Sequence, residues 1–69
     1  MTFDFAQEAF QANPNKETAQ NYLNSSIEYY EDDMIGEDTF NSATNELAIW
    51  ANETNSKLID PRFEGKNWN

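Results

Sequence analysis

The residues in this chain that are best suited to chemistry are carboxylates. Six of them fall between positions 28 and 38, with no lysine or arginine among them. We call this group the acidic knob, and its members are Glu28, Glu31, Asp32, Asp33, Glu37 and Asp38. A surface of one negative sign attracts cations and basic proteins, and it repels nucleic acids and acidic membranes. We therefore expect no direct binding to nucleic acid or to a membrane.

The rest of the composition excludes most catalytic chemistry. The chain has no histidine and no cysteine, so the usual general base, a thiolate nucleophile and Cys/His zinc sites are all absent. The only glycines are Gly36 and Gly65, which rules out a glycine-rich phosphate loop. Paired carboxylates need a cleft that raises one pKa, and 69 residues leave little room for one. We expect a non-enzymatic protein without a cofactor.

A hard cation is one possible ligand of the acidic knob. Calcium takes about six to eight oxygen ligands, and in an EF-hand these come from one loop. When the EF-hand glycine is set on Gly36, Glu31 and Asp33 fall at the first and third ligand positions. Ile35 then falls at the fifth position and Ser42 at the last, where a glutamate is required. We expect weak, nonspecific binding of divalent cations and no dedicated metal site.

A second possibility is that the carboxylates imitate nucleic-acid phosphates. Helix residues three or four positions apart lie about 5–6 Å apart, and duplex DNA carries one charge per ~1.7 Å of its axis. Two acidic rows across a helical hairpin could therefore offer a similar field to a protein that reads phosphates. In size, charge and lack of His and Cys the chain is similar to small DNA-mimicking inhibitors that phages make. This likeness is one of composition, without a shared motif. The alternative is an acidic face that only keeps the protein in solution.

Three helices are predicted to position the acidic knob. Apolar residues at helical spacing indicate a short helix over 3–12. Asp4 and Gln7 could form its capping box, and Asn13-Pro14 ends it. A second helix begins after a cap at Asn13 or Asn15. One face of this helix is formed by Ala19, Tyr22, Leu23, Ser26, Ile27, Tyr30 and Met34.

A third helix follows the turn at Gly36. Its apolar face is formed by Phe40, Ala43, Leu47, Trp50, Ala51 and Thr54. A loop of about three or four residues makes the last two helices antiparallel, and we expect Trp50 at the centre of their core. No strand is predicted. The fold class is all-α: a small antiparallel helical hairpin, with a short N-terminal helix packed across it and an irregular C-terminal tail.

The charge divides the chain into two parts. Residues 1–56 hold eleven acids and one base, whereas residues 57–69 hold three bases and two acids. We interpret 1–56 as an acidic three-helix mini-domain. The remaining 57–69 form a tail that either packs on the core or binds a partner. A net charge of -9 on so small a chain predicts a marginally stable fold.

Two functions remain open. The first is a cytoplasmic protein, in the host cytoplasm if the protein is viral, that binds a basic surface of a partner through the acidic knob. Such a partner could be a nucleic-acid-processing protein, and the chain its inhibitor. The alternative is a small structural or adaptor subunit that binds through Arg62, Phe63 and Trp68 of the tail, since aromatic and arginine side chains are common anchors of interfaces. Ile49, off the main face of its helix, could contact the first helix or the tail, or it could form a homodimer or partner surface.

Overall fold

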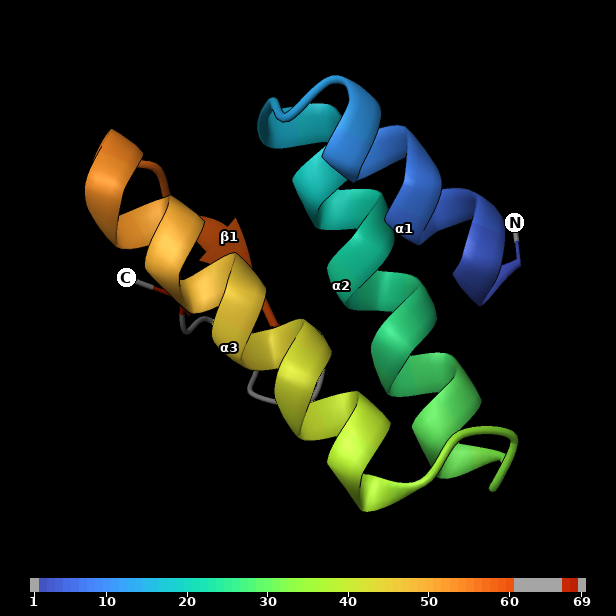
Figure 1. Cartoon of the computed structure of the whole chain (residues 1–69). Helices are drawn as coiled ribbons and strands as arrows, with labels where there is room; N and C mark the ends of the chain where they lie inside the picture. Colours follow the sequence, from blue (N-terminus) through green and yellow to red (C-terminus); the bar gives the residue numbers. More distant parts are fainter. Residues whose placement is uncertain (1, 61–66, 69) are drawn as a thin grey trace.

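The computed structural model describes residues 2–60 and the backbone of residues 67–68 (Figure 1). It contains three helices: α1 (Phe3–Ala12), α2 (Lys16–Glu31) and α3 (Glu37–Thr54). Two short strands follow, β1 (Leu58–Ile59) and β2 (Asn67–Trp68). The α2 helix is central, because α1, α3 and β1 all pack against it. The predicted all-α fold, a hairpin with an N-terminal helix packed on it, is confirmed.

The N-terminal caps of the first two helices use small polar side chains. Thr2 caps α1, and its hydroxyl accepts a hydrogen bond from the Phe5 N–H at 3.1 Å. The predicted capping box of Asp4 and Gln7 is therefore wrong, since α1 begins one residue before Asp4. Asn15, the later of the two predicted caps, begins α2. Its side chain accepts from the Thr18 N–H at 2.9 Å, and the Thr18 hydroxyl accepts from the Asn15 N–H at 3.1 Å.

The turn between α2 and α3 is built differently from the prediction. It spans residues 32–36, one or two more than expected. The Met34 N–H donates to the Tyr29 carbonyl at 2.8 Å, and the Asp33 N–H donates to the Tyr30 carbonyl at 3.1 Å. These are the two hydrogen bonds of a Schellman motif, and Asp33 holds its left-handed position with φ 58°. Gly36, by contrast, lies in extended backbone and caps α3.

The core lies between α2 and its neighbours. Tyr22, Leu23 and Leu47 are fully buried at its centre. The other buried apolar residues are Phe3, Ala6, Phe10, Ala19, Ile27, Phe40, Ala43, Ala51 and Leu58. Aromatic rings join the helices, because Tyr30 stacks on Phe40 with centroids 4.3 Å apart and Phe10 meets Trp50 edge to face at 5.6 Å.

Three expectations about the core were wrong. Trp50 is only half-buried and packs against α1 at the edge of the hairpin, so it is not the central residue. Thr54 is exposed in the last turn of α3. Met34 is also exposed, because α2 ends at Glu31 and the Schellman motif turns the chain away from the helical face before Met34 is reached.

A partly exposed polar network connects all three helices. The Tyr22 hydroxyl of α2 accepts a hydrogen bond from the Gln7 side chain of α1 at 3.0 Å. The same hydroxyl donates to Glu46 of α3 at 3.0 Å, and Gln11 of α1 donates to the other oxygen of Glu46 at 3.2 Å. Burial, reinforced by Glu46, raises the pKa of Tyr22 to about 12. The network therefore holds a neutral hydroxyl between the helices.

After α3 the chain folds back on α2. Asn55 ends α3 in the left-handed conformation, with φ 53°. The buried side chain of Leu58 then joins the core. The β1 strand pairs antiparallel with β2, so the prediction of a chain without strands is wrong for these two short segments. The Gln20 side chain holds β1 by accepting from the Ile59 N–H at 2.9 Å and donating to the Ile59 carbonyl at 2.7 Å.

Candidate functional site

All six carboxylates of the acidic knob are exposed. Glu28 and Glu31 lie at the end of α2, and Asp32 and Asp33 lie in the turn that follows. Glu37 lies beside Asp38 in the first turn of α3. The acidic knob thus occupies the end of the hairpin where α2 passes into α3, shown in green and yellow-green in Figure 1. The six carboxylates therefore lie at the same end of the hairpin.

The two halves of the acidic knob differ in their effect on helix stability. Glu37 and Asp38 lie at the N-terminal end of α3, where the helix dipole stabilises negative charge. Asp32 is the C-cap of α2, at the negative end of its dipole, where a carboxylate is unfavourable. Asp33 holds a left-handed position that glycine occupies with less strain. Asp32 and Asp33 therefore stand where helix stability alone would favour other residues.

The acidic knob does not form a ligand cage. Within residues 2–60, no three carboxylates come close enough together to hold a metal ion. Glu31 and Asp33, the two residues that matched EF-hand positions, lie on either side of the helix end rather than in one calcium-binding loop. In this geometry the acidic knob presents a diffuse negative field, which suits the recognition of positive charges on another molecule.

The alternative site in the tail is only partly visible. Arg62 and Phe63 lie outside the described residues, and Trp68 is described only as a backbone position of β2. Leu58 is buried in the core. Ile59 beside it has 59% of its surface exposed, and Ile49 on α3 has 53% exposed. The described part of the chain therefore brings no apolar patch of the tail together with the acidic knob.

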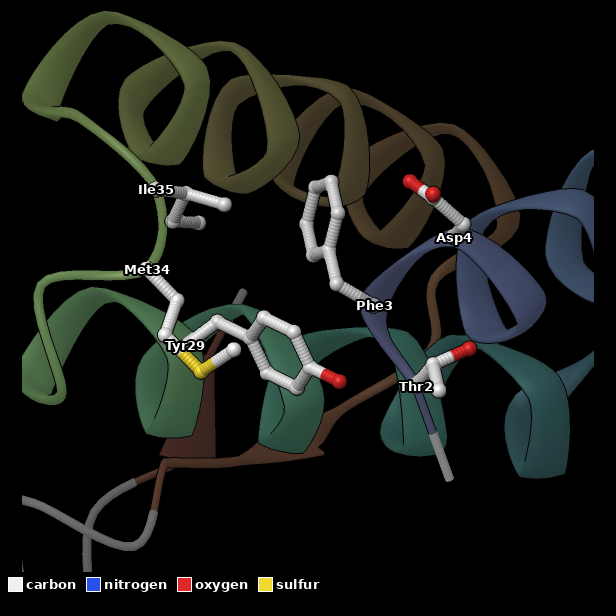
Figure 2. A pocket seen from close by; sticks show the side chains of 6 residues that line it. All are labelled: Thr2, Phe3, Asp4, Tyr29, Met34 and Ile35. Carbon is white, nitrogen blue, oxygen red and sulfur yellow. The ribbon is translucent and has the colours of Figure 1, made fainter.

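A groove next to the acidic knob was missed by the sequence reasoning. It lies between the start of α1 and the turn after α2, with a volume of about 320 Å³. Figure 2 shows its lining side chains: the ring of Phe3 stands across from Met34 and Ile35, and the ring of Tyr29 lies below them. Thr2 and Asp4 complete the lining. The one sequence signal was Met34, an apolar residue just beyond two aspartates, but its spacing had placed it in the core.

None of the helices in the described ranges has both the length and the apolar character that crossing a bilayer requires. Comparisons with protein families, with curated proteins and with solved structures found no match to this chain.

Proposed function

We propose that this protein is a non-enzymatic binding protein whose acidic knob recognises a basic surface on a partner protein. The observation that carries the proposal is the exposure of all six carboxylates at one end of the α2–α3 hairpin, with no basic residue between positions 28 and 38. Nothing in that stretch neutralises their field, so a partner rich in lysine and arginine is favoured over nucleic acids and acidic membranes, which carry the same sign.

The most specific form of this proposal is inhibition of a nucleic-acid-processing protein. Carboxylates on the last turn of α2 and on the first turn of α3 form two short acidic rows that are joined by a turn. A protein that binds phosphates through lysine and arginine would meet charges of the right sign on two adjacent rows. In this role the chain occupies the nucleic-acid site of its partner, as a phage-encoded inhibitor would in the cytoplasm of its host.

Two carboxylates placed at a cost to stability support a binding role. Asp32 and Asp33 lie where a neutral or basic residue, or glycine, would suit the end of α2 better. A cluster that served only to keep the protein in solution could be placed elsewhere on the surface at no such cost. The unfavourable positions are explained if these charges are required on the turn itself.

The proposal is tested with two triple variants of equal net charge. In the first, Glu28, Glu31 and Glu37 of the acidic knob are replaced by lysine. The control replaces exposed glutamates outside the acidic knob by lysine, at Glu8, Glu17 and Glu53. The two sets are also matched in that Glu37 and Glu17 each lie in the first turn of a helix. Circular dichroism must first show that both variants retain the helical content of the wild type.

Each tagged protein is then used in a pull-down from nuclease-treated lysate, washed at about 0.05 M and then about 0.5 M NaCl. We expect the wild type and the control to retain a nucleic-acid-processing protein that high salt elutes, and the variant of the acidic knob to lose it. Equal loss in both variants would show that net charge alone matters. Equal retention in both would contradict the role of the acidic knob.

The exposure of Ile49 and Ile59 favours a second function, that of a small structural or adaptor subunit. Such a subunit binds through apolar contacts, of which Phe63 and Trp68 of the tail would be further members. Apolar contacts are not screened by salt, so the partner of an adaptor would survive the wash at high salt. Replacing Ile49 and Ile59 by serine would release that partner, and it would leave a partner of the acidic knob bound.

A further inference from the structure

The groove beside the acidic knob has enough volume to hold one large side chain. Its volume of about 320 Å³ is near the low end of the range of about 300–1,000 Å³ found for small-molecule sites. Phe3 is buried, and its ring lies 6.1 Å from the ring of Tyr29 between centroids. Ile35 is half-buried, and Met34 has 64% of its surface exposed. Most of the lining residues are apolar or aromatic (Figure 2), and Met34 is the most exposed of these.

The turn holds Met34 at the edge of this groove. The Tyr29 carbonyl accepts from the Met34 N–H at 2.8 Å and from the Ile35 N–H at 3.4 Å, so the backbone of both residues is tied to the last turn of α2. In a Schellman motif the residues in the positions of Met34 and Tyr29 commonly pack together, and here both side chains line the groove (Figure 2). The thioether side chain of methionine is flexible and adapts to differently shaped apolar groups.

Carboxylates in the lining of the groove, or close to it in sequence, determine which kind of occupant suits it. Asp4 lines the groove, Asp33 directly precedes Met34, and Glu37 follows Ile35 by two residues. An apolar segment without positive charge would leave the negative charge of these carboxylates unbalanced, so it is a less favourable occupant. A second copy of this chain would bring another net charge of -9, and an acidic lipid surface would also be repelled. Lysine and arginine, in contrast, can lay their apolar stems on Met34 and Tyr29 while their charged ends reach the carboxylates.

We propose that the groove receives one large apolar side chain, such as phenylalanine or leucine, from a lysine- or arginine-rich segment of the partner protein. This inference rests on the proposed function and adds the class of segment that the acidic knob recognises. The carboxylates attract the segment, and the groove sets its register, because only an apolar residue flanked by basic ones satisfies both surfaces.

Two synthetic peptides test this inference. Both are capped at each end, carry four lysines in a glycine–serine background and bear a fluorescent label. One has phenylalanine at its centre, and its matched control has serine there. Their Kd values for the full chain are measured by fluorescence anisotropy at about 0.05 M and about 0.5 M NaCl. We expect the phenylalanine peptide to bind about tenfold more tightly, which is the gain from partial burial of one aromatic side chain. High salt should weaken the binding of both peptides and leave the ratio of their Kd values unchanged.

Two variants place the effect in the groove. Met34→Ser should bring the ratio of the two Kd values close to one. Phe5→Ser is the matched control, since it removes an exposed apolar side chain that does not line the groove, and it should leave the ratio unchanged. The chain has two methionines, so this variant also assigns the Met34 methyl signal in NMR spectra. That signal should shift on titration with the phenylalanine peptide and much less with the serine peptide.

The possible failures have different meanings. Equal affinities for the two peptides, with binding still weakened by salt, would refute binding of the apolar side chain in the groove. The acidic knob would then remain as the binding surface. A tenfold ratio that survives Met34→Ser would also refute binding in the groove, since the phenylalanine would then bind elsewhere. If neither peptide bound at low salt, both the groove and the proposed function would be refuted.

Discussion

Replacing Tyr22 by phenylalanine tests the polar network that connects the three helices. The ring of Tyr22 is fully buried, and its hydroxyl exchanges hydrogen bonds with Gln7 and Glu46, each at 3.0 Å. Phenylalanine keeps the ring and removes only the hydroxyl. Both partners are half-buried and can turn to water, so near neutral pH we expect a loss of about 1–2 kcal/mol in the free energy of unfolding.

The same substitution should change the pH dependence of stability. Burial is the main cause that raises the pKa of Tyr22 from 10.0 to about 12, with smaller contributions from Glu46. The pKa of Tyr22 is higher in the folded than in the unfolded state, so the neutral hydroxyl contributes to the stability of the wild type. This contribution is fully present below pH 10 and is lost as the pH rises towards 12. At about pH 11, one unit above the unfolded pKa, the loss is about 1.4 kcal/mol. Tyr22→Phe lacks this hydroxyl and should not show this alkaline loss of stability.

The assay is urea unfolding, followed by far-ultraviolet circular dichroism at about pH 8 and about pH 11. The wild type should exceed Tyr22→Phe in stability at the lower pH, and the difference should shrink by about 1.4 kcal/mol at the higher pH. Tyr30→Phe is the control, because it also removes one tyrosine hydroxyl but leaves Tyr22 in place. This variant should lose stability at alkaline pH as the wild type does. Glu46→Gln should reduce that loss without abolishing it, since burial is the larger cause. A difference between wild type and Tyr22→Phe that is the same at both pH values would refute the reasoning.

Three further predictions concern stability, and urea unfolding measures each of them. Asn15→Ala removes the side-chain acceptor that begins α2 and should cost about 1 kcal/mol; a cost near zero would show that Thr18 caps the helix alone. Leu58→Ala empties a fully buried position and should cost about 2–5 kcal/mol, whereas Ile59→Ala at an exposed position should cost far less; equal costs would contradict the packing of β1. Asp33→Gly relieves the left-handed backbone and should stabilise the fold by about 0.5–1 kcal/mol while weakening salt-sensitive peptide binding; destabilisation would show that the carboxylate itself supports the turn.

Local rules account for what could be predicted about the helices. The spacing of apolar residues reports which of them share a helix face, and that face is buried at Ala19, Tyr22 and Leu23 of α2. Asn15 could be named as a candidate cap because its hydrogen bond reaches only three residues along the chain. The acidic knob could be recognised for a similar reason: its members lie within eleven consecutive positions, so no long-range packing is needed to bring them near one another.

The tertiary structure decided the contacts between residues that are distant in sequence. Gln20 holds the backbone of Ile59 across 39 positions, and no periodicity signals such a pairing. Met34 fits the helical spacing of α2. However, the helix stops before Met34, where backbone hydrogen bonds from the turn return to its last turn, and the Met34 side chain is exposed. The groove exists because the start of α1 is packed against the end of α2, which places Phe3 across from Met34. Sequence alone determined the helices and the charge of the acidic knob. The groove beside it depends on how those helices pack, because periodicity identifies the face that is buried but not the residues that it meets.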